Sequence, residues 1–405
     1  MQIYNFLSCV LLCVVSLSSL ANVSVGVRPN YQIELLAPSV LKSRLKSCEH
    51  KPMKGQSFAI GHRGAPLQFP EHTRESYIAA AKMGAGALEC DVTFTKDAQL
   101  VCRHSQCDLH ATTDILLQPS LAKTCRQPFE SYNEQTGQAA SALCCTSDIT
   151  VDEFLTLKGK MDGVNPKAKT PAEFVQGTEK WRTDLYAQTG TLMTHKQSIQ
   201  LFQSLDVKMV PELKQPMVEM PFFGLTQTQY ATMLFNEYQQ AGVKWQDVWL
   251  QSFQFSDIEF WLAHPTIPAE QIVWLDERYE QAEFNANDPS TWQPPMQQLA
   301  QAGLKNLAPP IWVLVQLSEQ GEIIPSAYAL AAKKAGLNLI AWSFERSPPR
   351  GAMWYYQSVQ SAIRHSGDKL VVLDVLAQQV GVKAVFSDWP ATAAYYANCL
   401  DLTGL

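Results

Sequence analysis

The sequence has few long apolar runs, little net charge and no detectable repeat, and each absence excludes a class of protein. After the first 26 of its 405 residues, no segment is apolar enough to cross a bilayer. The formal net charge is −6 and no basic stripe occurs, so a nucleic-acid partner is not expected. With 46% apolar and 17% charged residues the composition is that of a globular protein, long enough for two average domains or one large barrel.

The first 26 residues differ from the rest of the chain. Residues 6–20 form an apolar run that is too short to span a membrane comfortably. Ser19 and Ala21 follow it in the pattern that a signal peptidase accepts. The segment contains no Lys or Arg, which leaves an uncleaved anchor as the alternative. We expect a signal peptide over residues 1–21, an N-terminal extension over 22–56, and a secreted or periplasmic protein with no stable membrane span.

The cysteines also favour export. Once the signal peptide is removed, an even set of eight remains, and no two are spaced as Cys-x-x-Cys, the pairing typical of zinc sites. Four of them, Cys107, Cys125, Cys144 and Cys145, crowd into one loop-like region, where disulfide bridges would replace a missing core. We expect bridges there, although the sequence leaves their connectivity open.

Short β-rich apolar runs recur along the chain with amphipathic helical patterns between them. Eight such runs with intervening helices predict an α/β fold, a (β/α)₈ TIM barrel. The expected strands are Ser57–Gly61, Ala87–Thr93, Val207–Leu213, Val248–Phe253, Ile272–Leu275, Leu304–Leu307, Leu337–Ser343 and Ala384–Ser387. Polar residues follow most of these strands, at the end where barrel active sites are built.

One segment breaks this rhythm. Residues 105–200 stand where a barrel unit allows only a short loop, and they are rich in Cys, Thr, Gly and Pro. A loop of that length is usually functional or a small subdomain. We interpret it as a large cap, inserted after the second strand within a barrel domain that spans residues 57–397.

Charged residues gather at three expected strand ends. Strand side chains alternate between faces, so Glu89 and Asp91 share one face, and so do Glu212 and Lys214. Two carboxylates on the inward face of a buried strand repel each other and lose water, and a bound divalent cation explains them best. Hard oxygen ligands select Ca²⁺ or Mg²⁺, and we favour Ca²⁺ because an exported protein meets it in plenty.

The remaining residues of this group suit phosphoryl chemistry. Arg63 and Lys214 can neutralise a phosphoryl group, and His62 and His104 can act as acid and base on its two sides. Near the seventh expected strand end, the aromatic ring of Trp342 can pack against the carbon atoms of a ligand.

Five motifs appear in a characteristic order: His-Arg-Gly from His62, Pro-Glu-His-Thr from Pro70, Glu-Cys-Asp from Glu89, Val-Cys-Arg-His from Val101 and Pro-Glu-Leu-Lys from Pro211. Together they resemble the glycerophosphodiester phosphodiesterase family. The resemblance covers most of the chain from Ser57 onward, and Phe386-Ser387-Asp388-Trp389-Pro390 is similar to that family's closing strand. It implies metal-dependent hydrolysis of glycerophosphodiesters, small molecules of lipid and glycerol metabolism, to glycerol 3-phosphate and an alcohol.

Carried over motif by motif, the resemblance assigns roles to individual residues. It implies that His62 and His104 are the acid–base pair, that Arg63 and Lys214 contact phosphate, and that Glu71 lies near the glycerol. The implied metal ligands are Glu89, Asp91 and Glu212. Trp342 completes the candidate substrate-binding residues.

The sequence departs from the family pattern at two positions. His72 stands where the family usually has Asn, and Ser105 where it usually has Asp, which puts the orientation of His104 in doubt; Asp108 could compensate. The long cap leaves the size of the substrate open. Lysophospholipase D or phospholipase C-like activity on acylated lipids is therefore the alternative enzyme hypothesis, and a non-catalytic binding protein on this scaffold is the third. The sequence indicates neither the leaving alcohol nor the oligomeric state.

Overall fold

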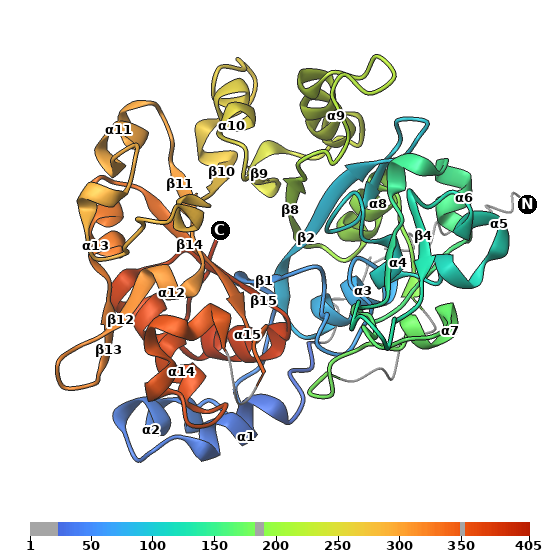
Figure 1. The fold of residues 1–405 in the computed structure, drawn as a ribbon. Coiled ribbons are helices and arrows are strands. Elements are labelled where there is room, and N and C mark those ends of the chain that lie inside the picture. Colours follow the sequence, from blue (N-terminus) through green and yellow to red (C-terminus); the bar gives the residue numbers. More distant parts are fainter. Residues whose placement is uncertain (1–22, 183–189, 349–352) are drawn as a thin grey trace, which may run out of the picture.

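The computed structural model describes residues 23–182, 190–348 and 353–405, and Figure 1 shows their arrangement. The expected signal peptide lies outside the described residues. None of the described helices has the length and apolar character that crossing a bilayer requires.

Eight parallel strands close into a barrel, which confirms the predicted fold class. They follow one another around the barrel in chain order, and pairing of the first with both the second and the last completes the ring. The strands are β1 (Gln56–Gly61), β2 (Ala85–Phe94), β8 (Lys208–Leu213), β9 (Leu250–Ser252), β10 (Ile272–Leu275), β11 (Asn306–Ala308), β14 (Asn338–Phe344) and β15 (Ala384–Ser387).

Helices follow the strands and form the outer layer (Figure 1). They are α3 (Arg74–Lys82), α8 (His195–Ser204), α9 (Gln227–Gln240), α10 (Phe255–Leu262), α11 (Met296–Gln301), α12 (Ile311–Leu314), α13 (Ala327–Lys334), α14 (Asp368–Asp374), which runs on into a π-helical segment (Val375–Val380), and α15 (Pro390–Cys399). Helix α3 begins directly after Thr73, whose side chain accepts a hydrogen bond from the Ser76 N–H. A short hairpin, β12 (Val315–Leu317) with β13 (Ile323–Pro325), lies between α12 and α13.

The barrel interior is filled by alternate residues of the strands. One apolar cluster contains Ile60 of β1, Ala87 of β2, Val210 of β8 and Phe386 of β15, together with inward residues of the other strands. The opposite faces of the same strands pack against the surrounding helices in a separate, larger cluster. This alternation decides which polar side chains enter the barrel mouth.

The described residues 105–182 and 190–194 belong to the predicted cap and lie beside the barrel in Figure 1. It follows β3 (Leu100–Cys102), which pairs antiparallel with β2. Its helices and strands are α4 (Leu109–Thr112), α5 (Pro119–Ala122), β4 (Gln127–Glu130), β5 (Ser141–Leu143), α6 (Val151–Thr156), β6 (Lys158–Gly159), α7 (Pro171–Phe174) and β7 (Gly190–Thr191). The cap has an apolar core of its own that includes Leu109, Phe154 and Phe174. The last residues of the predicted segment belong to α8, which packs on β2 and β8.

Four disulfides cross-link the described chain, and they confirm that the cap cysteines form bridges. Cys107–Cys145 and Cys125–Cys144 lie within the cap. Cys90–Cys102 joins β2 to β3 on the face opposite Glu89 and Asp91. Cys48–Cys399 joins the N-terminal extension, α1 (Arg28–Leu35) and α2 (Val40–Lys46), to the last helix.

Candidate active site

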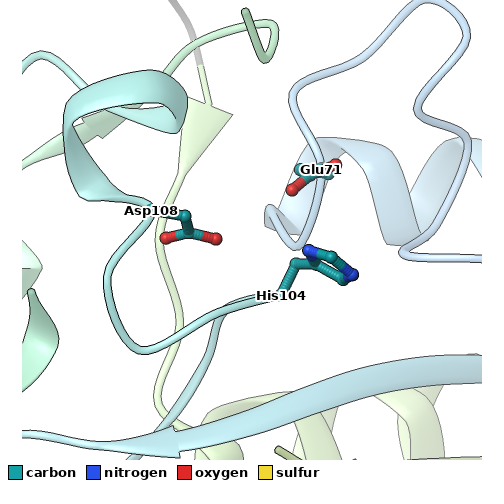
Figure 2. Close-up of side chains that lie close together, drawn as sticks. All are labelled: Glu71, His104 and Asp108. Atoms are coloured by element: carbon teal, nitrogen blue, oxygen red, sulfur yellow. The ribbon is translucent and has the colours of Figure 1, made fainter. Parts of the chain in front are cut away.

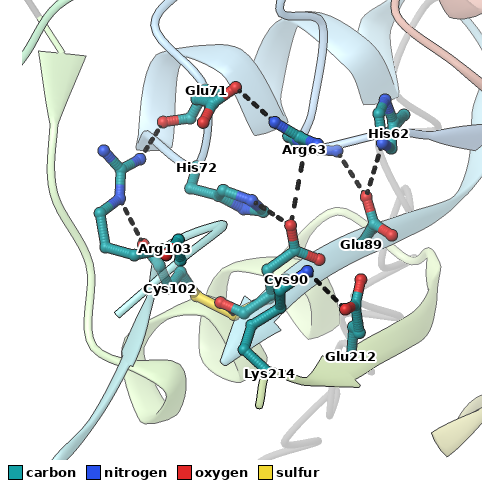
Figure 3. Close-up of polar contacts among 12 residues, drawn as sticks. His62, Arg63, Glu71, His72, Glu89, Cys90, Cys102, Arg103, Glu212 and Lys214 are labelled. Carbon is teal, nitrogen blue, oxygen red and sulfur yellow. Dashed lines mark hydrogen bonds and ion pairs between the residues drawn. A yellow bond between two sulfur atoms is a disulfide. The ribbon is translucent and has the colours of Figure 1, made fainter. Parts of the chain in front are cut away.

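Strand register brings the predicted carboxylates together at the mouth of the barrel. Glu89 and Asp91 have the same parity as inward-facing Ala87, and Glu212 has the same parity as Val210. Asp91 and Glu212 are direct partners across the β2–β8 pairing. Each of the three offers an oxygen that lies within 4.8 Å of the other two, and all three side chains are buried. Figure 3 shows Glu89 and Glu212 with Arg63 and Lys214 beside them.

The chemistry of this carboxylate cluster fits a hard divalent cation. Burial, followed by the charges of Asp91 and Glu212, raises the pKa of Glu89 well above its usual value. Burial also raises the pKa of Glu212 to about 7. Oδ1 of Asp91 is buried and has no hydrogen-bond partner among the described residues. A cation would relieve the repulsion and coordinate this oxygen, since Ca²⁺ and Mg²⁺ take carboxylate ligands.

Two positively charged side chains, those of Lys214 and Arg63, flank the carboxylate cluster. Nζ of Lys214 lies 2.5 Å from Oε1 of Glu212. Arg63 has a left-handed backbone with φ of 55°, and Gly64 follows with φ of 93°. This turn directs the Arg63 N–H to Oε2 of Glu89 at 2.9 Å, while the guanidinium reaches Oε2 of Glu71 at 3.0 Å. The turn after β1 therefore connects Glu89 of the carboxylate cluster, through Arg63, to Glu71.

His62 is oriented by an aspartate from the last strand end. Its Nδ1 lies 2.6 Å from Oδ1 of Asp388, and its Nε2 lies 3.9 Å from Oε2 of Glu89. Burial and the nearby Arg63 guanidinium lower the pKa of His62 to about 4, although Asp388 acts in the opposite direction. Because a carboxylate accepts the proton of Nδ1, Nε2 carries the lone pair and faces the cavity.

His104 also lines the cavity and lies near two carboxylates. One nitrogen of its ring and one carboxylate oxygen each from Glu71 and Asp108 lie within 4.8 Å of one another (Figure 2). Asp108 therefore occupies the neighbourhood that the family's aspartate at position 105 would have supplied, while Oγ of Ser105 lies beside Sδ of Met217. Burial, then Arg63 and Lys214, lowers the pKa of His104 well below its usual value.

His72, the other departure from the family pattern, lies behind the carboxylate cluster. Its Nε2 is 2.9 Å from Oδ2 of Asp91 and its Nδ1 is 2.9 Å from the hydroxyl of Tyr77. The ring is fully buried. Its N–H donates to the carboxylate and its other nitrogen accepts from the tyrosine, so His72 fixes the rotamer of Asp91.

The site opens into a cavity of about 430 Å³. Seven of the nine predicted site residues line it, namely His62, Arg63, Glu89, His104, Glu212, Lys214 and Trp342. The other two predicted residues, Asp91 and Glu71, do not line the cavity. Glu71 binds Arg63 and lies 3.7 Å from the guanidinium of Arg346, and its expected place near the glycerol stays a prediction.

Three residues that complete the site were not assigned a role from the sequence. Asp388 orients His62, and the sequence signal was present, since it ends a strand within the closing motif. Arg346 lies 3.0 Å from Oδ2 of Asp388 and joins that dyad to Glu71. Gln251 donates from Nε2 to Oε1 of Glu89 at 3.0 Å. Two other polar strand-end residues, Ser252 and Asp276, bond to Asp257 and Arg278.

Comparisons with known proteins agree on one family. A model of the glycerophosphoryl diester phosphodiesterase family matches residues 62–392. An extracellular protein of Arthroderma benhamiae is 46% identical over 249 residues, which cover 60% of this chain and all of that protein. A glycerophosphodiester phosphodiesterase of Haemophilus influenzae is 37% identical over 86 residues, 20% of this chain and 23% of that enzyme.

Among solved structures, one from Silicibacter pomeroyi, named a putative glycerophosphoryl diester phosphodiesterase, has the same fold. The match has a TM-score of 0.53 at 16% sequence identity, and it covers 89% of this chain and 98% of that one.

Proposed function

Because the chain belongs to the glycerophosphoryl diester phosphodiesterase family, and is thus an enzyme that hydrolyses glycerophosphodiesters, we propose that it acts on deacylated phospholipids outside the cell with a divalent cation. The observation that carries this proposal is the convergence of two histidines, three carboxylates, Arg63 and Lys214 on one small cavity. Glycerol 3-phosphate and an alcohol are the products.

Glu89, Asp91 and Glu212 would hold the cation, with Ca²⁺ favoured and Mg²⁺ possible as a replacement. When bound, it polarises the phosphoryl oxygens and offsets the negative charge that develops in the transition state. Arg63 and Lys214 bind the same phosphoryl group from the protein side. His72 and Gln251 orient Asp91 and Glu89, so that the carboxylates stay in place while the substrate enters and leaves.

The two histidines divide the proton transfers. His62 is neutral at pH 7 and its Nε2 faces the cavity, so it takes the proton from the attacking oxygen. Attack by water gives glycerol 3-phosphate directly, whereas attack by the substrate's own glycerol hydroxyl gives a cyclic phosphate that water then opens to glycerol 3-phosphate. Asp388 stabilises the imidazolium that forms. His104, near Glu71 and Asp108, then protonates the departing alkoxide. The phosphodiester's own negative charge and these two carboxylates favour the protonated form of His104 in the complex.

The cavity favours a deacylated substrate over an acylated one. Its volume of about 430 Å³ is near the lower end of the roughly 300–1,000 Å³ typical of small-molecule pockets. A glycerophosphodiester fills such a space, whereas a lysophospholipid would have to place its acyl chain outside it. We therefore rank lysophospholipase D or phospholipase C-like activity second.

Export is part of the proposal. Four disulfides cross-link the described chain, which is typical of an oxidising compartment. The similar Arthroderma benhamiae protein is named extracellular, and the apolar N-terminal run supplies the expected signal peptide.

The proposal is tested by glycerol 3-phosphate release from several glycerophosphodiesters, before and after dialysis against excess chelator. We expect chelation to abolish release and added Ca²⁺ or Mg²⁺ to restore it. A conservative variant, Glu212→Gln, should need a higher cation concentration for half-maximal rate, and calorimetric titration with the cation should show the same weakening. Full turnover in excess chelator would refute the metal requirement, and no release from any diester would refute the function.

A further inference from the structure

The cavity at the barrel mouth has two chemically different ends. One end is charged and contains the histidines, Arg63, Lys214 and the carboxylates described above. The other end is mainly aromatic, and the lining residues there include Phe253, Tyr279, Glu280, Trp342 and Trp354. A phosphodiester has two ester arms, so an arm that extends from the phosphoryl group into this second end meets aromatic rings.

The aromatic residues form a continuous wall. Nζ of Lys214 lies 5.7 Å from the centre of the Phe253 ring, which marks the border between the two ends. The centre of Phe253 lies 5.8 Å from that of Trp342, and Trp342 stacks on Trp354 at 6.0 Å with an interplanar angle of 24°. Tyr279 lies edge-on to Trp354 at 5.6 Å. The Trp342 N–H donates to the Ala308 carbonyl at 2.7 Å, which fixes that ring.

Among the described residues that line the aromatic end, Glu280 alone carries a formal charge, and that charge is negative. Glu280 ends the short helix Arg278–Glu280 after β10 and is exposed to solvent. Tyr279, next to it, contacts both tryptophans of the wall. The cavity therefore runs from a cation-rich phosphoryl site to an aromatic wall with one carboxylate.

This distribution of charge complements a zwitterionic diester. We propose that the aromatic end is a subsite for a leaving alcohol with a quaternary ammonium group, of which choline is the simplest example. A quaternary ammonium has no N–H to donate, and aromatic faces attract it without needing a hydrogen bond. Glu280 adds a long-range attraction at the mouth. This inference rests on the proposed function, because it assigns the second arm of the same substrate.

The test compares kcat/KM for glycerophosphocholine, glycerophosphoethanolamine and glycerophosphoglycerol with the full mature chain. We expect the choline ester to be preferred over the glycerol ester by roughly 5- to 30-fold, the range that one or two cation–π contacts support. Trp354→Leu and Glu280→Gln should each lower this preference by several-fold. Trp354→Phe keeps an aromatic face and should retain most of it. Glu283→Gln, an exposed neutralisation outside the cavity lining, is the matched control and should leave the preference unchanged.

A binding measurement separates the subsite from catalysis. Choline chloride should quench tryptophan fluorescence and inhibit competitively, and Trp354→Leu should weaken both effects, whereas glycerol should cause neither. Equal rates on all three diesters, a preference for the ethanolamine or glycerol ester, or a preference that Glu280→Gln and Trp354→Leu leave intact would overturn the inference while the proposed function stands. Absence of glycerol 3-phosphate from every diester would overturn both.

Discussion

The two ring nitrogens of His62 have different neighbours, and this difference determines what each can do. Nδ1 is held by Asp388 at 2.6 Å, so Nε2, which has only a longer contact of 3.4 Å with Oγ of Ser343, is the nitrogen that accepts a proton. The His104 ring, by contrast, has no hydrogen bond to any described residue and relies on the nearby carboxylates of Glu71 and Asp108. We therefore keep the proposal that His62 is the base and His104 the acid.

Replacing either histidine by Ala should lower turnover by about two to four orders of magnitude, the usual contribution of general acid–base catalysis. A diester with a nitrophenolate leaving group no longer needs the acid, so it should rescue His104→Ala far more than His62→Ala. Steady-state rates on activated and natural diesters measure this, with exposed His50→Ala as the control. Rescue in the opposite direction would exchange the two roles, and unchanged rates in both variants would refute the mechanism.

The ionised carboxylate of Asp108 should lower the stability of the fold while it supports turnover through His104. Burial raises its pKa from 3.8 to about 6, so ionisation of this carboxylate destabilises the fold as pH rises from about 4 to about 6. Asp108→Asn should therefore raise the free energy of unfolding at pH 8 by about 1–3 kcal/mol, with a smaller gain at pH 4. Turnover should fall because His104 loses a negative neighbour.

Denaturant unfolding of both proteins at the two pH values, together with initial rates, checks this prediction. Asp114→Asn is the matched control, since Asp114 is an aspartate of the cap outside the active-site cavity. An equal gain at pH 4 and pH 8 would show that packing, rather than ionisation, is responsible.

For single residues, the sequence predicts well which face of a strand a side chain lies on. It predicts poorly which other residue that side chain bonds to. Alternation along β2 and β8 is a local property, so the spacing of Glu89, Asp91 and Glu212 is enough to assign them to one face. The bond between His62 and Asp388 joins residues 326 positions apart and depends on closure of the barrel. The place of Glu71 near the glycerol stays a prediction from its motif, whereas its ion pairs with Arg63 and Arg346 join residues from separate elements and had no signal in the sequence.

Among the elements, the eight barrel strands were predicted to within a few residues because each is a short apolar run bounded by turns. The cap was harder. Its strands are only two to four residues long, and its core is assembled from scattered apolar residues, so periodicity gave no signal inside it. Its cysteine density did predict that covalent bonds would support it.

The cap should therefore depend on its disulfides more than the barrel does. Cys125–Cys144 closes a loop with a sequence separation of 19, and removing such a bridge costs about 3 kcal/mol. In a Cys125→Ala/Cys144→Ala variant we expect faster proteolysis within the cap. The far-ultraviolet circular dichroism of the whole protein, to which the barrel helices and strands contribute most, should be nearly unchanged. Limited proteolysis with mass mapping of the cut sites measures this. Cuts distributed equally over barrel and cap would contradict the prediction.

For the whole molecule, the N-terminal extension connects the outside of the barrel to the active site. Helix α1 packs on α14 and α15, and Nη2 of Arg28 lies 2.5 Å from Oε2 of Glu345. The next residue, Arg346, binds Asp388, which in turn orients His62. A chain of ion pairs and hydrogen bonds thus runs from the first described helix to the proposed base.

The disulfide between Cys48 and Cys399 fastens this extension to the last helix, and its removal provides the test at this scale. It closes a loop with a sequence separation of 351, so a Cys48→Ala/Cys399→Ala variant should lose roughly 3–5 kcal/mol of stability, most of it through the unfolded chain. The ion pair between Arg28 and Glu345 remains, so glycerol 3-phosphate release at 25 °C should stay within about twofold of the parent rate. Thermal unfolding and initial rates measure the two effects separately. A fall in rate as large as that of His62→Ala, in a variant still folded at 25 °C, would show that the bridge itself holds the active site in place.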